Sequence, residues 1–182
     1  MTSIMAAGKN LKNIAYDIAL IGIAIALIEV CKAAMMGLPN IELTSFWIIM
    51  FTLFLGRKIL LVIPAFVLIE GCMFGFGTWW IMYLYAWPLL VFLTWIFRKQ
   101  KNVLFWAVLS GLYGLFFGAM CAIPYVVIGS FDGGIRSGLY AGFTWWVAGI
   151  PFDLLHCAGN FALMLALYHP VKIAFSYVRK RK

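Results

Sequence analysis

The amino-acid sequence predicts an all-α membrane protein with six transmembrane helices and both termini in the cytoplasm. The chain is 65% hydrophobic and only 11% charged, whereas a soluble domain is about half apolar and about a quarter charged. Its apolar residues fall into runs that approach the roughly 20 residues a helix needs to cross a bilayer. Its positive charges recur in every second connection between those runs, a pattern typical of multi-pass membrane proteins.

Turn signals and charged connections separate the predicted helices. The first run is interpreted as a retained helix and not as a signal peptide, because it continues past the small-residue triplet at 24–26. It ends at the Gly-Leu-Pro-Asn turn of residues 37–40. The second and third runs are short, which predicts tilt, a kink at Pro64 or incomplete spanning. The six segments are residues 14–36, 42–55, 59 to about 71–77, 78–97, 102–130 and 139–167.

The chain is expected to form one membrane domain of residues 1–182. Residues 1–13 precede the first apolar run, and a basic tail of residues 171–182 follows the last one. Both are expected on the cytoplasmic side.

The net charge of +8 would suit a nucleic-acid-binding protein, but the cations gather between apolar runs, so we expect no nucleic-acid partner. Cytoplasmic loops of membrane proteins carry an excess of lysine and arginine. Only Lys32 and Arg136 fall on the opposite side. The cations expected in the cytoplasm are Lys9, Lys12, Arg57, Lys58, Arg98, Lys99, Lys101, Lys172, Arg179, Lys180, Arg181 and Lys182.

The sixth predicted helix carries an unusual polar stripe within an apolar run. At helical spacing, Asp153, His156 and Asn160 fall on one face with Trp146. A carboxylate and an imidazole are costly in hydrocarbon, so they should face protein or a water-filled pocket. Two further roles are open: Asp153 and His156 could satisfy one another, and Asn160 could join helices by a hydrogen bond.

Aromatic residues are expected to form the walls of a cavity that opens to the outside. Trp80, Tyr83 and Trp87 repeat at three and four residues along the fourth segment, and Tyr125 follows Pro124 in the fifth. Aromatic faces stack on flat, conjugated ligands. The alternative is an aromatic belt at the level of the lipid headgroups.

Three further polar residues lie towards the outer ends of the predicted helices and are candidate ligand contacts. Each has a structural alternative: Glu70 could pair with Lys32 or Arg136, Arg136 could be a solvated loop charge, and Asn40 could only shape a turn. The candidate binding set is therefore Asp153, His156, Asn160, Trp146, Trp80, Tyr83, Trp87, Tyr125, Asn40, Glu70 and Arg136.

The first predicted helix carries a stripe of small residues: Ala15, Ala19, Gly22 and Ala26. Small residues let a second helix approach closely in lipid, so the stripe predicts a docking face for a partner. Packing within the chain is the alternative there. For Ser110, Gly114 and Gly118 of the fifth segment, internal packing is the favoured interpretation.

No enzymatic activity, cofactor or metal site is expected. The chain has no G-x-S-x-G, H-E-x-x-H or Walker lysine motif. Its four cysteines include no C-x-x-C pair and are interpreted as small buried hydrophobic residues. Two other function classes stay open: an intramembrane enzyme that uses Asp153 and His156, and a structural or assembly protein whose polar stripe only joins helices.

The chain resembles the substrate-binding S component of an energy-coupling factor (ECF) vitamin transporter over nearly its whole length of 182 residues. The resemblance rests on six helices with both ends inside and on the A-x-x-x-A stripe of Ala15 and Ala19. It also rests on the Pro-Asn turn in residues 38–43 and on the polar sixth helix from residue 152 to 161. The pocket does not match the thiamine, riboflavin, biotin or folate members.

The resemblance implies a function in vitamin uptake at the bacterial cell membrane. Members of this family capture a vitamin or precursor in an outward cavity, using outer loops and the fourth to sixth helices. Their first-helix alanine stripe docks on a transmembrane coupling subunit that two ATPase subunits drive. The expected ligand is a small heteroaromatic compound, such as a B6 vitamer or a thiamine-related pyrimidine.

Overall fold

The computed structural model describes residues 2–180, and it describes side chains for residues 13–179. The described residues are almost all helical and include no β-strand. The elements are α1 (Thr2–Ala34), α2 (Thr44–Leu55), the 3₁₀ turn η1 (Gly56–Lys58), α3 (Ile59–Phe74), α4 (Thr78–Ile96), α5 (Val103–Leu115), α6 (Phe117–Cys121) and α7 (Ile123–Lys180). The expected all-α class is therefore confirmed.

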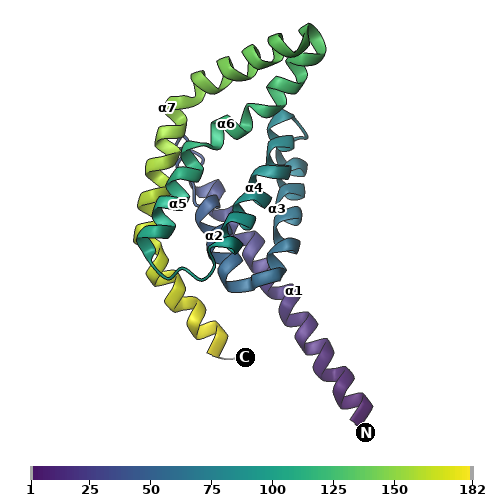
Figure 1. The fold of residues 1–182 in the computed structure, drawn as a ribbon. Helices are drawn as coiled ribbons and strands as arrows, with labels where there is room; N and C mark the ends of the chain where they lie inside the picture. Colours follow the sequence, from purple (N-terminus) through teal and green to yellow (C-terminus); the bar gives the residue numbers. More distant parts are fainter. Residues whose placement is uncertain (1, 181–182) are drawn as a thin grey trace.

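Helix α7 is two helices joined by a sharp break. Gly133 and Gly134 have non-helical backbone angles, and Gly134 has a φ of 76° with a ψ of 175°. Only glycine adopts this conformation readily, because a side chain would clash with the backbone. The break turns the chain back on itself, so the arm after Gly134 returns towards the end of the molecule where the C-terminus lies (Figure 1).

The helices run up and down the bundle, and α5, α6 and the first arm of α7 continue in one direction (Figure 1). The chain reverses in the segment after α1, at η1, between α3 and α4, between α4 and α5, and at the break in α7. The two ends of the chain lie towards the same end of the bundle (Figure 1). This up-and-down order suits a membrane-embedded chain with short connections.

Within the described residues, four stretches of helix are long and apolar enough to cross a membrane: Asn13–Ala34, Thr44–Phe74, Thr78–Ile96 and Val103–Arg179. The surface also exposes large apolar side chains, among them Leu61, Phe92 and Phe131. Lipid would cover such a surface, whereas water would not favour it. The fold is thus consistent with a helical membrane protein.

The core is built around α2, which is buried on almost every side. Phe46, Ile48 and Ile49 are fully buried there and pack with Trp87 of α4 and Trp106 of α5. Helix α2 contacts α1, α3, α4, α5 and α7. A helix that is apolar all round suits this central position.

Glycines allow α5 and α6 to approach α7 closely. A Cβ atom on Gly114 would lie 2.8 Å from the carbonyl oxygen of His156, and one on Gly118 would lie 2.3 Å from Asp153 Oδ2. The expected internal packing of this face is confirmed. The sequence placed these glycines in one helix, but the structure interrupts that helix after Leu115 and again after Cys121.

The predicted segments give the order of the helices but not their ends. Helix α1 begins at Thr2, inside the expected N-terminal tail, and α7 continues to Lys180 through the basic tail. The helix predicted over 139–167 resumes directly after Gly134. Hydropathy marks the part of a helix that suits lipid, whereas backbone hydrogen bonding continues into polar sequence.

Candidate functional site

Asp153 lies at the interface between α6 and α7 and is only 3% exposed. The backbone N–H of Gly118 donates a hydrogen bond of 2.9 Å to Asp153 Oδ1. The second oxygen, Oδ2, has no hydrogen-bond partner in the described part of the chain, although Trp146 lies beside the carboxyl group. Asp153 is thus held through Oδ1, and the Trp146 side chain is its second polar neighbour.

His156 is buried one turn further along α7, with 2% of its surface exposed. Its ring packs edge-to-face against Phe117, with centroids 5.1 Å apart and an interplanar angle of 73°. Neither ring nitrogen has a hydrogen-bond partner among the described residues. The alternative in which His156 and Asp153 satisfy one another is therefore wrong.

Asn160 follows on the same face and ties α7 to α5. Its Nδ2 donates to the carbonyl oxygen of Ser110 at 3.3 Å, while its Oδ1 has no partner among the described groups. Asn160 therefore joins two helices, as one alternative predicted, and still has a free acceptor.

A series of aromatic rings leads from this cluster along the bundle. Tyr83 and Trp87 have centroids 5.2 Å apart, Trp87 and Phe117 are 5.4 Å apart, and Phe117 contacts His156. Trp87 is fully buried, and its indole nitrogen has no acceptor among the described residues. The predicted aromatic residues Tyr83 and Trp87 thus lie against the predicted polar stripe, through Phe117.

A second polar cluster lies at the other end of this series; we call it the outer cluster, after the side of the membrane that the sequence predicts for it. Lys32 of α1 forms an ion pair with Glu70 of α3 and donates a hydrogen bond of 3.0 Å to the Tyr83 hydroxyl. Glu70 is 1% exposed, and Glu29 interacts with its carboxyl group. Of the roles that the sequence left open for Glu70, pairing with Lys32 is confirmed.

Glu42 lies in the connection between α1 and α2, and the charges of the same cluster act on its pKa. Burial raises the pKa of Glu42, the positive charge of Lys32 opposes this effect, and Glu70 adds to it. The outer cluster therefore holds three carboxyl groups near one lysine. The sequence interpretation does not predict that these four residues lie together.

The other predicted binding residues do not join either cluster. Trp80 donates to the carbonyl oxygen of Val67 at 2.8 Å, and Tyr125 stacks on Trp145 with centroids 4.7 Å apart. Asn40 is exposed in a turn with a φ of 53°. Arg136 is exposed just after the break in α7. Asn40 thus lies in a turn, as its structural alternative predicted, whereas Arg136 is exposed but lies in a helix and not in the expected loop.

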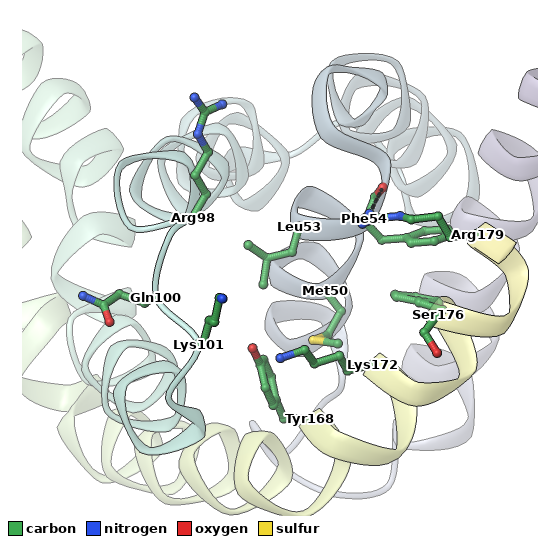
Figure 2. A pocket seen from close by; sticks show the side chains of 11 residues that line it. Met50, Leu53, Phe54, Arg98, Gln100, Lys101, Tyr168, Lys172, Ser176 and Arg179 are labelled. Atoms are coloured by element: carbon green, nitrogen blue, oxygen red, sulfur yellow. Dashed lines mark hydrogen bonds between the residues drawn. The ribbon is translucent and has the colours of Figure 1, made fainter.

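Three cavities stand out, and none of them is lined by the polar stripe of α7 or by Trp80, Tyr83, Trp87 or Tyr125. The aromatic-walled cavity expected at the stripe is therefore not found among them, because Trp80, Tyr83 and Trp87 pack into the core instead. One of about 440 Å³ opens beside the outer cluster and is lined by Glu29, Lys32, Glu70 and neighbouring apolar side chains. A second, of about 390 Å³, is lined by apolar residues of α4 and α5 and of the chain just after α5. The third, of about 540 Å³, lies near the C-terminal end of α7 (Figure 2).

Sequence reasoning missed Phe117 as a neighbour of His156, the hydrogen bond from Lys32 to Tyr83, and the one from Asn160 to Ser110. A signal for Lys32 existed, since Glu29 and Lys32 stand three residues apart inside an apolar helix. Phe117 gave no signal, because an aromatic residue in an apolar run is common.

Within the described residues, no group of three or more histidine, cysteine or acidic side chains is placed to hold a metal ion. The four cysteines are free. Cys121 is buried, as expected, but Cys72 is exposed on α3, so the expectation of a buried thiol is wrong there.

Comparison of the chain with protein-family models, with curated proteins and with solved structures finds no match.

The small-residue stripe of α1 lies on the outside of the bundle. Ala15, Ala19, Gly22 and Ala26 are all exposed, and a Cβ atom on Gly22 would meet nothing within 4 Å. Helix α1 packs on the bundle through its other face, where Ala24 and Ile28 are buried. The alternative of packing within the chain is therefore wrong for this stripe.

Proposed function

We propose that this chain is the solute-capturing subunit of an importer in the bacterial cell membrane. It binds a vitamin or vitamin precursor from outside the cell and performs no chemistry on it. In this proposal the chain crosses the membrane six times, with both termini in the cytoplasm and the Lys32–Glu70 cluster towards the outside.

One observation carries the proposal: buried polar atoms of the α7 stripe lack partners. They are Asp153 Oδ2, both ring nitrogens of His156, and Asn160 Oδ1. Leaving a buried donor or acceptor unsatisfied costs about 1–3 kcal/mol for each group. A bound solute that supplies the missing partners would recover this free energy, which makes the stripe a candidate binding surface.

The chemistry of these atoms favours a small heteroaromatic solute. Asp153 Oδ2 and Asn160 Oδ1 accept hydrogen bonds, so they suit a hydroxyl or amino substituent. His156 donates from one nitrogen and accepts at the other, which suits a ring nitrogen or a second substituent. Phe117 and Trp87 provide the aromatic surface on which a flat ring stacks. A B6 vitamer or an aminopyrimidine has this combination of groups.

Import also needs a source of energy, which we assign to a separate coupling subunit with two ATPase subunits. The exposed stripe of Ala15, Ala19, Gly22 and Ala26 supports docking to such a subunit, because small side chains permit close helix contact in lipid.

The experiment is mass spectrometry of the compound that the purified chain retains after extraction from its own membrane. His156→Ala is expected to lose the compound while the chain still folds, whereas His169→Ala is expected to keep it. His169 is the matched control, because it is the other histidine of the chain and is exposed on the same helix.

Three results would contradict the proposal. Retention of the same compound by His156→Ala would remove the α7 stripe from the binding site. Loss of folding with no bound compound in the parent protein would favour a structural role. Conversion of the compound by the purified chain would favour an intramembrane enzyme.

A further inference from the structure

A basic cavity lies at the end of the bundle opposite the outer cluster. Its volume is about 540 Å³, and its walls come from α2, from the connection between α4 and α5, and from the last part of α7 (Figure 2). By the charge asymmetry of the sequence, this end faces the cytoplasm.

The cavity gathers positive charge without an acidic partner. Arg98, Lys101, Lys172 and Arg179 line it, and no aspartate or glutamate does. The ion pairs found in the described residues are Lys32–Glu70 and Lys58–Asp17, so none of the four cations is paired. Like charges at close range repel, and a bound anion would relieve that repulsion.

Aromatic residues hold two of the cations beside an apolar wall. The Arg179 guanidinium lies 5.7 Å from the centroid of Phe54, and the Lys172 ammonium lies 5.1 Å from that of Tyr168. Phe54 in turn stacks on Phe175, with centroids 4.2 Å apart. The polar ends of Lys101, Tyr168 and Lys172 point towards the middle of the cavity (Figure 2).

We propose that this cavity binds the phosphate headgroup of an anionic membrane lipid. Lysine, arginine and a tyrosine hydroxyl are suitable donors to phosphate oxygens. The stacked rings of Phe54 and Phe175, with Leu53 beside them, give the acyl chain an apolar surface. Basic cavities between helices on the cytoplasmic side are known sites for anionic headgroups.

The site has a structural consequence that does not depend on the captured solute. Its walls come from three parts of the chain that are distant in sequence, so one bound lipid would tie the end of α7 to α2 and to the α4–α5 connection. The lipid is therefore expected to stabilise the whole chain.

The test uses the full-length protein, stripped of lipid in detergent and then titrated with phosphatidylglycerol or phosphatidylcholine. Native mass spectrometry counts the bound lipids, and thermal unfolding measures stabilisation. The variant is Lys101→Gln with Lys172→Gln. The matched control is Arg57→Gln with Lys99→Gln, which removes the same charge from the same end of the molecule but outside the cavity.

Phosphatidylglycerol is expected to bind and to raise the unfolding temperature more than zwitterionic phosphatidylcholine. Each cation near an anionic headgroup contributes about 1 kcal/mol, which is about fivefold in affinity. The cavity variant should therefore bind about 25-fold more weakly, while the control changes less than about twofold. Equal weakening in both double variants, or equal binding of both lipids, would overturn the proposal.

A second arm separates a lipid from a free phosphate compound. Glycerol phosphate carries the charge but no acyl chain, so it should compete only at much higher concentration than phosphatidylglycerol. Competition at equal concentration would overturn the lipid assignment. If the cavity variant fails to fold, the parent protein still decides the point, because binding that does not weaken with added salt would contradict phosphate recognition.

Discussion

A hydrogen bond joins Gly118 of α6 to Asp153 in the polar stripe of α7. The Gly118 N–H donates to Asp153 Oδ1 at 2.9 Å. This N–H is available because α5 ends at Leu115 and α6 begins at Phe117, and the first N–H groups of a helix have no partner within it. The interruption of the predicted fifth helix thus supplies the donor that orients a candidate binding residue.

Gly118→Ala should therefore displace Asp153. A Cβ atom there would lie 2.3 Å from Oδ2 and 2.6 Å from Oδ1, which is closer than non-bonded atoms approach. Overpacking of this kind costs about 1–3 kcal/mol. We expect a lower thermal unfolding temperature in detergent and weaker retention of the captured compound.

Gly149→Ala is the control for this substitution. It lies on α7 near Asp153, and a Cβ atom there meets nothing within 4 Å. Since alanine is the better helix former, it should leave stability unchanged or raise it by up to about 1 kcal/mol. If the two variants behaved alike, the Gly118–Asp153 contact would have no energetic importance.

Lys32→Met should be among the most destabilising single changes in the outer cluster. It leaves Glu70, which is 1% exposed, as a buried carboxylate beside Glu29. Breaking a buried ion pair on one side costs about 3–5 kcal/mol, and replacing both partners by apolar residues is often neutral. Thermal unfolding should show a large loss for Lys32→Met and a recovery in the double variant with Glu70→Met.

The pair of Lys58 and Asp17 offers a direct contrast. Both side chains are about one-third exposed, at 32% and 34%. Exposed pairs contribute about 0–1 kcal/mol, so Lys58→Met should have a small effect. A loss as large as that of Lys32→Met would show that burial does not distinguish the two pairs.

Stability should fall as pH rises because of Glu42. Burial raises its pKa above the ordinary value of about 4.5, so the folded state holds the proton more tightly than the unfolded state. This contribution is fully present below pH 4.5 and is lost as pH rises through the folded-state pKa.

Glu42→Gln tests that dependence, because the amide stays neutral at every pH. The variant should match the parent protein in acid and become the more stable of the two as pH rises, as measured by unfolding at a series of pH values. Asp132→Asn is the control, since it removes one negative charge from an exposed position. A constant difference between Glu42→Gln and the parent across the series would count against buried ionisation.

Periodicity and charge predicted the helical class, the order of the segments and the polar stripe, because hydropathy records burial in lipid directly. Asp153, His156 and Asn160 were found because polar groups in an apolar run are conspicuous.

The partners of these residues could not be predicted in this way. The Gly118 N–H became available through a helix break that hydropathy does not mark, and Phe117 contacts His156 only through the packing of α6 on α7. The basic cavity could not be predicted either, since Arg98 and Arg179 are distant in sequence and line one cavity only because α7 continues through the tail.

The exposed face of α1 gives the last prediction, which concerns a partner and not the chain alone. Ala19→Trp should leave the stability of the isolated chain unchanged, because Ala19 is exposed and the tryptophan displaces nothing in the bundle. It should abolish co-purification with the proposed coupling subunit and stop uptake, since close helix packing in lipid depends on small side chains.

Ile18→Trp is the control: Ile18 is 64% exposed on the same helix and points about 100° away from Ala19. Because both variants add a large aromatic surface to α1, loss of uptake in both would indicate a general effect of bulk, and persistence in both would remove the stripe as a docking face. Loss in Ala19→Trp alone assigns the contact to the face that α1 turns away from its own bundle.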